Sequence, residues 1–216
     1  MTEPMATSSA APSNPDAAAT SDEKGALRRT PLYDVHRALG ARMVAFAGWE
    51  MPVQYASIID EHRTVRTAVG LFDLSHMGEL LVSGPDALAF VRYCVISDPS
   101  SLEAGQAQYS MLCARDGGVI DDLIIYRIHE GYLLVCNAAN RAADVAHLRG
   151  LLAPGGFNAT LQDRSDATGL VAPQGPRAAA LAFSVPVPGQ GSRVTAAAAV
   201  DPRVGDSAFT PGTLVP

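Results

Sequence analysis

The sequence contains no apolar run long enough to cross a bilayer and no excess of basic residues. A membrane-spanning helix needs about 20 consecutive apolar residues, and a nucleic-acid-binding surface is normally basic. This chain of 216 residues instead has a formal net charge of −6, with only 18% of its residues charged. We therefore expect neither a membrane nor a nucleic acid among its partners.

Closely spaced cysteines and histidines are also missing. The three cysteines, Cys94, Cys113 and Cys136, form no C-x-x-C motif, and the five histidines form no H-x-x-x-H or H-E-x-x-H motif. Such spacings are the usual signatures of zinc sites, so no metal site is predicted. An odd cysteine count without the apolar core of a secretory signal is typical of reduced thiols in a cytoplasmic protein.

Large apolar side chains are almost absent from residues 1–29, which are mainly Ala, Ser, Thr, Pro and Asp. Such a segment cannot offset the entropy lost on ordering, so it is predicted to be disordered. It has acidic residues and no arginine before Arg28, unlike a mitochondrial presequence. Residues 183–216 contain five prolines and no regular period, and they are predicted to be irregular or disordered. One domain remains, over residues 30–182.

This domain is predicted to be α+β, with an antiparallel sheet and helices. Two strand-like runs, 107–114 and 119–128, flank the sequence Arg-Asp-Gly-Gly. Asp-Gly between such runs predicts a hairpin, because the tight turn requires positive φ. A third strand over 132–137 extends the hairpin to a meander. Other signals predict helices over 31–39, 58–69, 85–95 and 140–152, and strands over 43–46, 79–82, 157–161 and 168–172.

The only tryptophan, Trp49, lies in a segment over 47–55 that is predicted to be a loop. Two interpretations of this residue stay open. Either the indole fills a gap in the core, as tryptophan often does, or the loop lines a ligand pocket.

Three aspartates are candidates for chemistry. Asp121 and Asp122 are neighbours on a predicted strand, so their side chains point to opposite faces and cannot act as a carboxylate pair on one substrate. We expect structural roles for them, with one facing solvent and the other paired within the fold. Asp98 precedes Pro99 in a loop between a helix and the hairpin. Such loops often carry functional residues, although aspartate before proline is also an ordinary turn residue.

Five segments, in order and in register, resemble the T-protein of the glycine cleavage system. They are TPLYDVH at 30–36, MVAFAGWEMPVQY at 43–55, LFDLSHMG at 71–78, GGVIDDLI at 117–124 and LVCNAAN at 134–140. The resemblance runs from about Thr30 to about Leu181. Five motifs at the family's spacing are a far more specific signal than any one of them.

The resemblance implies a tetrahydrofolate-dependent aminomethyltransferase. That family takes the one-carbon unit of an aminomethyl group from the lipoyl arm of H-protein, passes it to tetrahydrofolate and releases ammonia, in glycine catabolism and one-carbon metabolism. The implied partners are lipoylated H-protein and the other glycine cleavage components. The implied co-substrate is tetrahydrofolate.

The resemblance also implies site residues. The family's catalytic aspartate precedes an L-x-P-G-Q run, and Asp98, before Leu-Glu-Ala-Gly-Gln at 102–106, matches it. Its implied role is to orient the folate and assist proton movement, because a carboxylate accepts hydrogen bonds and stabilises developing positive charge. Tyr109, Asn137 and Met77 are the residues implied to line the folate pocket.

Several features depart from the family pattern. The family has Thr-Asn before the aspartate, where this chain has Ile96 and Ser97. The family's second half, with its G-Y-T-G-E segment, has no counterpart here, so residues 30–182 correspond to an incomplete folate-binding domain. One alternative is therefore a truncated, non-catalytic fragment that binds folate or docks H-protein. Another is the related folate-dependent iron–sulfur assembly proteins, whose K-G-C-x-x-G-Q-E signature is absent.

Overall fold

The computed structural model describes residues 26–180. The predicted disordered tails lie outside this range, apart from the last residues of the first tail. Arg28 is ordered, because its backbone N–H donates to Gly48 and its carbonyl accepts from Glu50. An isolated β-bridge joins it to Trp49. Residues 26–29 of the predicted first tail are thus among the described residues, and the domain boundary at residue 30 stays a prediction.

The described chain alternates short helices and strands, and none of its helices is long and apolar enough to cross a membrane. The helices are α1 (Tyr33–Ala38), α2 (Ile58–Thr67), α3 (Ala87–Cys94), η1 (Pro99–Ser101), α4 (Arg141–Gly155) and η2 (Ser165–Ala167). The strands are β1 (Arg42–Phe46), β2 (Trp49–Gln54), β3 (Gly70–Asp73), β4 (Gly78–Ser83), β5 (Ala107–Cys113), β6 (Val119–Ile128), β7 (Gly131–Cys136), β8 (Thr160–Asp163) and β9 (Val171–Gln174).

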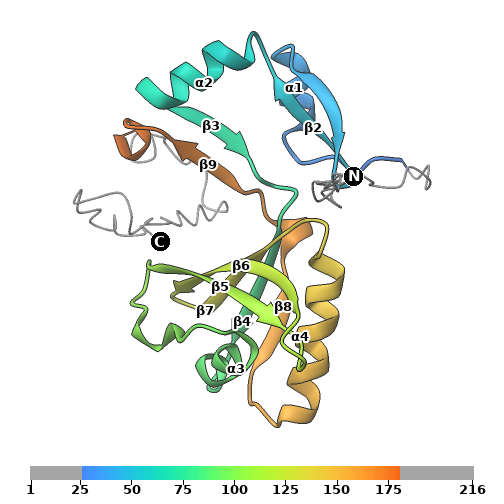
Figure 1. Cartoon of the computed structure of the whole chain (residues 1–216), viewed down its shortest axis with the longest axis vertical. Coiled ribbons are helices and arrows are strands. Elements are labelled where there is room, and N and C mark those ends of the chain that lie inside the picture. Colours follow the sequence, from blue (N-terminus) through green and yellow to red (C-terminus); the bar gives the residue numbers. More distant parts are fainter. Residues whose placement is uncertain (1–25, 181–216) are drawn as a thin grey trace, which may run out of the picture.

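The main sheet has five antiparallel strands in the order β5-β6-β7-β4-β8 (Figure 1). The predicted α+β class and the meander are confirmed, since β6 pairs with both β5 and β7. The hairpin turn closes with a hydrogen bond from the Ala114 N–H to the Gly118 carbonyl, at 2.8 Å. Gly117 has a φ of 91°, which glycine adopts without steric cost.

One face of the main sheet carries the hydrophobic core. Leu80, Ile125 and Leu134 come from three different strands, and each is 0% exposed. They pack with Phe90 of α3 and Leu148 of α4, which are also fully buried. Burying each such side chain stabilises the fold by about 1.5–3 kcal/mol relative to exposure. This packing makes the main sheet the rigid support for the residues on its other face.

A second region consists of two small sheets, β1-β2 and β3-β9, with α1 and α2 (Figure 1). The loop predicted over 47–55 is wrong in part, because Trp49 begins strand β2. Ala47 and Gly48, with φ of 48° and 81°, form the tight turn of a β1–β2 hairpin instead. The indole is 6% exposed and the Arg28 guanidinium lies 4.1 Å from its ring centre. Trp49 is thus a core residue, although it also borders a cavity described below.

Two further boundaries differ from the predictions. Helix α4 continues to Gly155, with Pro154 inside its last turn, rather than ending at residue 152. Strand β8 begins at Thr160 rather than at 157, because the Phe157 ring packs against the rings of α3 instead of entering the sheet. The predicted strand over 168–172 likewise begins later, as β9.

Candidate functional site

A row of polar side chains lies along three neighbouring strands of the main sheet. Tyr109 of β5 donates from its hydroxyl to Asp122 Oδ2 of β6, at 2.8 Å. Asp122 Oδ1 accepts from Nδ2 of Asn137, which follows β7, at 2.9 Å. Tyr109 is 58% exposed, so its ring is open to a ligand. The structure therefore brings two of the predicted folate residues together, with Asp122 between them.

Met77 lies at the same end of the sheet. Gly78, the first residue of β4, pairs with Cys136, the last residue of β7. The residues just beyond this pair, Met77 and Asn137, are therefore neighbours in antiparallel register. Met77 is half-buried, in a turn closed by a hydrogen bond from its N–H to the Leu74 carbonyl.

Asp98 lies on a separate loop that is fastened to β5. Ser97, the preceding residue, donates from its hydroxyl to Ser110 Oγ at 2.7 Å. The N–H of Ile96 donates to the Met111 carbonyl at 3.2 Å. These bonds and the antiparallel bridge between Val95 and Leu112 hold the Asp98 loop along the edge of β5, the strand that carries Tyr109.

The Asp98 carboxylate is an exposed anion held from two sides. Its Oδ1 accepts from the Ser100 N–H at 3.0 Å, as the N-cap of η1, and lies 2.9 Å from Arg92 Nε. The hydrogen bonds from Ser100, together with the charge of Arg92, keep the pKa of Asp98 below its ordinary value. Among the described residues, no hydrogen bond joins this carboxylate to Tyr109 or Asn137. Asp98 thus lies beside the polar row and outside its hydrogen-bond network.

The predicted opposite orientation of Asp121 and Asp122 is confirmed. Asp121 is 3% exposed on the core side, whereas Asp122 is exposed. Asp121 accepts from the backbone N–H of Asn137 at 3.0 Å, from its Nδ2 at 2.9 Å, and from the side-chain amide of Asn140. Burial raises the pKa of Asp121, but these hydrogen bonds outweigh burial and bring the pKa below its ordinary value. Asn140 is the N-cap residue of α4, but its side chain binds Asp121 and makes no capping hydrogen bond.

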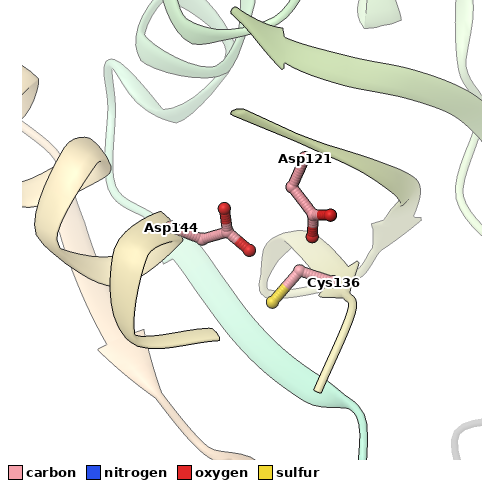
Figure 2. Close-up of side chains that lie close together, drawn as sticks. All are labelled: Asp121, Cys136 and Asp144. Carbon is pink, nitrogen blue, oxygen red and sulfur yellow. The ribbon is translucent and has the colours of Figure 1, made fainter. Parts of the chain in front are cut away.

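Sequence reasoning missed two residues that join Asp121. Figure 2 shows Asp121 of β6, Cys136 of β7 and Asp144 of α4 pointing toward one another. One side-chain atom of each lies within 4.8 Å of the others, and all three residues are buried. Burial raises the pKa of Asp144 to about 7 and raises the pKa of the Cys136 thiol. The sequence did contain a signal that Asp144 is buried. Asp144 is four residues before Leu148, so the two side chains share the apolar face of the helix.

Comparisons with known proteins identify the family. The family model described as the GCVT N-terminal domain matches residues 32–186. An aminomethyltransferase from Thermus thermophilus is 54% identical over 156 residues, which cover 72% of this chain and 44% of the relative. The chain belongs to the glycine cleavage system aminomethyltransferase family. The family inferred from the five sequence motifs is confirmed.

Two further aminomethyltransferases agree. One from Rubrobacter xylanophilus is 53% identical over 155 residues, which cover 72% of this chain and 41% of the relative. The crystal structure of glycine cleavage system aminomethyltransferase T from Bartonella henselae matches with a TM-score of 0.64 and 39% identity, over 73% of this chain and 43% of that chain. This chain therefore spans less than half the length of the relatives it matches.

Three of the aminomethyltransferase motifs converge on one hydrogen-bonded array in the second region. The Tyr55 hydroxyl lies 2.7 Å from His36 Nδ1, and His36 Nε2 lies 2.9 Å from Asp73 Oδ2. Thr30 donates to the same Asp73 oxygen at 2.6 Å. The side chains of His36 and Asp73 are 8% and 1% exposed. This array ties the chain before α1, α1 itself, β2 and β3 together, so these motif residues have a structural role here.

Two cavities of about 470 Å³ each share Arg28 and Asp166 in their walls. Trp49 borders the first cavity and Arg141 borders the second. Arg141 also forms ion pairs with Asp163 at 2.9 Å and with Asp166 at 2.8 Å. None of the four predicted site residues lines either cavity. Of the four predicted site residues, Asp98 and Tyr109 are exposed, and Met77 and Asn137 are half-buried.

Proposed function

We propose that this chain provides the folate-facing surface of an aminomethyltransferase that moves the one-carbon unit of aminomethyl-lipoyl H-protein to tetrahydrofolate and releases ammonia. The observation that carries the proposal is the Asp98 loop, fastened to β5 beside the row of Tyr109, Asp122 and Asn137. An exposed aromatic ring next to an amide and a carboxylate suits a flat ligand that makes hydrogen bonds, such as a pterin.

Asp98 supplies negative charge at the reacting centre. Because Ser100 and Arg92 lower its pKa, the carboxylate is ionised at neutral pH. An anion at this position stabilises the positive charge that develops on the aminomethyl carbon. A carboxylate with a lowered pKa is a weak base, so electrostatic stabilisation is its main role and proton transfer a lesser one. Tetrahydrofolate, when bound, supplies the nitrogen that accepts the one-carbon unit.

The remaining predicted residues hold the folate. The Tyr109 ring offers a stacking surface, the Asn137 amide offers hydrogen bonds, and Met77 offers an apolar contact at the same end of the sheet. Lipoylated H-protein and the other glycine cleavage components are the partners that this activity requires. The three cysteines are free thiols in the structure, in keeping with a cytoplasmic location.

The proposal is tested by Asp98→Asn, which keeps the shape of the side chain and removes its charge. We expect the formation of methylene-tetrahydrofolate from aminomethyl-lipoyl H-protein to fall by roughly 100-fold or more. Asp116→Asn is the matched control, because Asp116 is exposed in the hairpin turn and its amide variant still accepts the Gly118 N–H. Equal rates for wild type and Asp98→Asn would rule out the role assigned to Asp98.

A second candidate function is a non-catalytic module that binds folate or docks H-protein. The Thermus thermophilus aminomethyltransferase, which this chain matches over 44% of that relative's length, is the reference for the whole enzyme. Calorimetry with tetrahydrofolate, alongside a turnover assay that uses this relative as a positive control, separates the two functions. Folate binding without turnover supports the module, and turnover by this chain supports the enzyme.

A further inference from the structure

Asp144 is a buried carboxyl group whose nearest polar neighbours are a second acid, Asp121, and the weakly donating thiol of Cys136. The residue is 0% exposed, and neither side-chain oxygen has a hydrogen-bond partner. Figure 2 shows the carboxyl group aimed at Asp121, with the Cys136 sulfur next to both. A buried ionised carboxylate is strongly disfavoured when its only neighbouring donor is as weak as a thiol. Asp144 is therefore either protonated or neutralised by a cation.

Asp121, by contrast, is surrounded by donors. Its two oxygens accept from the Asn137 backbone, the Asn137 side chain and the Asn140 side chain. Of the two neighbouring acids, Asp121 is therefore the one that carries the charge, and a proton on Asp144 can be donated to it.

The charged groups around the pair supply no cation to it. Cys136 faces the pair from β7, and its thiol stays protonated because burial raises its pKa. Arg141 of α4 is engaged by Asp163 of β8 and by Asp166. Glu79 of β4 is itself buried, and burial raises its pKa to about 8. A proton is thus the simplest neutralising charge, in agreement with the pKa of about 7 for Asp144.

We propose that Asp144 and Asp121 form a proton-sharing pair that positions Asn137 for the folate. Asn137 is held by Asp121 through both its backbone and its side chain, and the same amide nitrogen reaches Asp122, which accepts from Tyr109. Asn137 thus links the buried pair, on the core side of the sheet, to the exposed row on the other side. Asp121 and Asp144 are positioning residues in this proposal, which rests on the proposed folate site.

Whether Asp144 is protonated then controls how firmly Asn137 is held in the row. Above neutral pH, loss of this proton places two negative charges side by side, and their repulsion moves Asp121 away from Asn137. Asp144→Asn removes this response, because its amide donates an N–H to Asp121 and does not titrate. The variant therefore keeps Asn137 in place at every pH, as the protonated acid does.

The first test follows the side-chain amide of Asn137 by NMR in the ¹⁵N-labelled chain between pH 5.5 and 8.5, with the signal assigned by its loss in Asn137→Asp. We expect it to titrate near pH 7 in the wild type and to stay constant in Asp144→Asn. His147→Gln controls for the nearest histidine on α4 and must leave the titration in place. An amide that does not titrate in the wild type, or that still titrates in Asp144→Asn, overturns the proposal.

The second test measures the affinity for tetrahydrofolate by anaerobic calorimetry over the same pH range. We expect it to weaken at least threefold from pH 6 to pH 8.5 in the wild type and to stay constant in Asp144→Asn. If the wild-type chain binds no tetrahydrofolate, the proposed function is wrong. The titration of the Asn137 amide still shows whether Asp144 and Asp121 share a proton. Zn²⁺ is then added to both chains. If it shifts the signal of the Asn137 amide in the wild type but not in Asp144→Asn, a cation and not a proton neutralises the pair, and the proposal is overturned.

Discussion

The main sheet and the second region bury their apolar residues to very different extents. The main sheet and its two helices share one core in which Leu80, Phe90 and Leu148 are fully buried. In the second region, helix α2 has no buried residue at all. Large apolar side chains there remain exposed: Val35, Leu39, Val44, Phe46, Val53, Ile58, Ile59, Leu71, Phe72 and Val171.

Topology explains this difference. The hairpins of the main sheet join strands that are close in the chain, and α3 and α4 cover one face. The second region has sheets of two strands each, and all the strands of the main sheet lie between β3 and its partner β9 in the sequence. Two-stranded sheets are only marginally stable in water. The second region therefore depends on specific polar contacts, such as the array of His36 and Asp73, more than on a core of its own.

The largest loss of stability is expected from a matched pair of leucine substitutions. Leu148→Ala removes a 0% exposed side chain from the core and should lower the free energy of unfolding by about 3 kcal/mol. Leu71→Ala, at a site that is 63% exposed in the second region, should cost under about 0.5 kcal/mol. Urea denaturation followed by circular dichroism measures both. Similar costs for the two variants would contradict the contrast between the regions.

A pH-dependent effect is expected at Glu79, which is 1% exposed and has no partner for either carboxylate oxygen. Burial raises its pKa to about 8, although Arg141 opposes this. The unfolded chain releases the proton near pH ~4.3, so wild-type stability falls relative to Glu79→Gln as the pH rises from there to about 8. The difference should reach on the order of 5 kcal/mol.

Urea denaturation at several pH values between 4 and 8.5 measures this difference. Asp60→Asn is the control in the second region, because the Asp60 side chain is 71% exposed. Its stability should follow that of the wild type at every pH. If Glu79→Gln also runs parallel to the wild type, the buried carboxyl group is not protonated in the folded state.

The smallest effect is expected from Tyr55→Phe, which removes one hydrogen bond to His36 in the second region. The loss should cost about 1 kcal/mol. Hydrogen exchange shows which region is destabilised. The amides of β1 and β2 should exchange faster, and the exchange rates of those of β5 and β6 should not change. Equal acceleration in both regions would show that they unfold as one unit, which would break the comparison.

Local signals predicted much of the fold. Asp116 and Gly117 between apolar runs predicted the β5–β6 hairpin, because a tight turn is decided by a few residues. The same kind of reasoning failed at Trp49. The segment was predicted to be a loop, but Ala47 and Gly48 form a tight turn and Trp49 begins strand β2. The α+β class followed from the helix and strand signals and the family from motif order, and the comparisons confirm both. The folate roles of Asp98 and its neighbours stay predictions.

The sequence by itself determined which strands form hairpins, that Asp121 and Asp122 face opposite ways, and to which family the chain belongs. These properties depend on turn residues, on the two-residue period of a strand and on motif order. Only the tertiary structure decided that Asp144 meets Asp121, and that Asn137 connects this buried pair to Tyr109. These contacts join β6, the end of β7 and α4, and no pattern of spacing along the chain specifies the packing of a helix on a sheet.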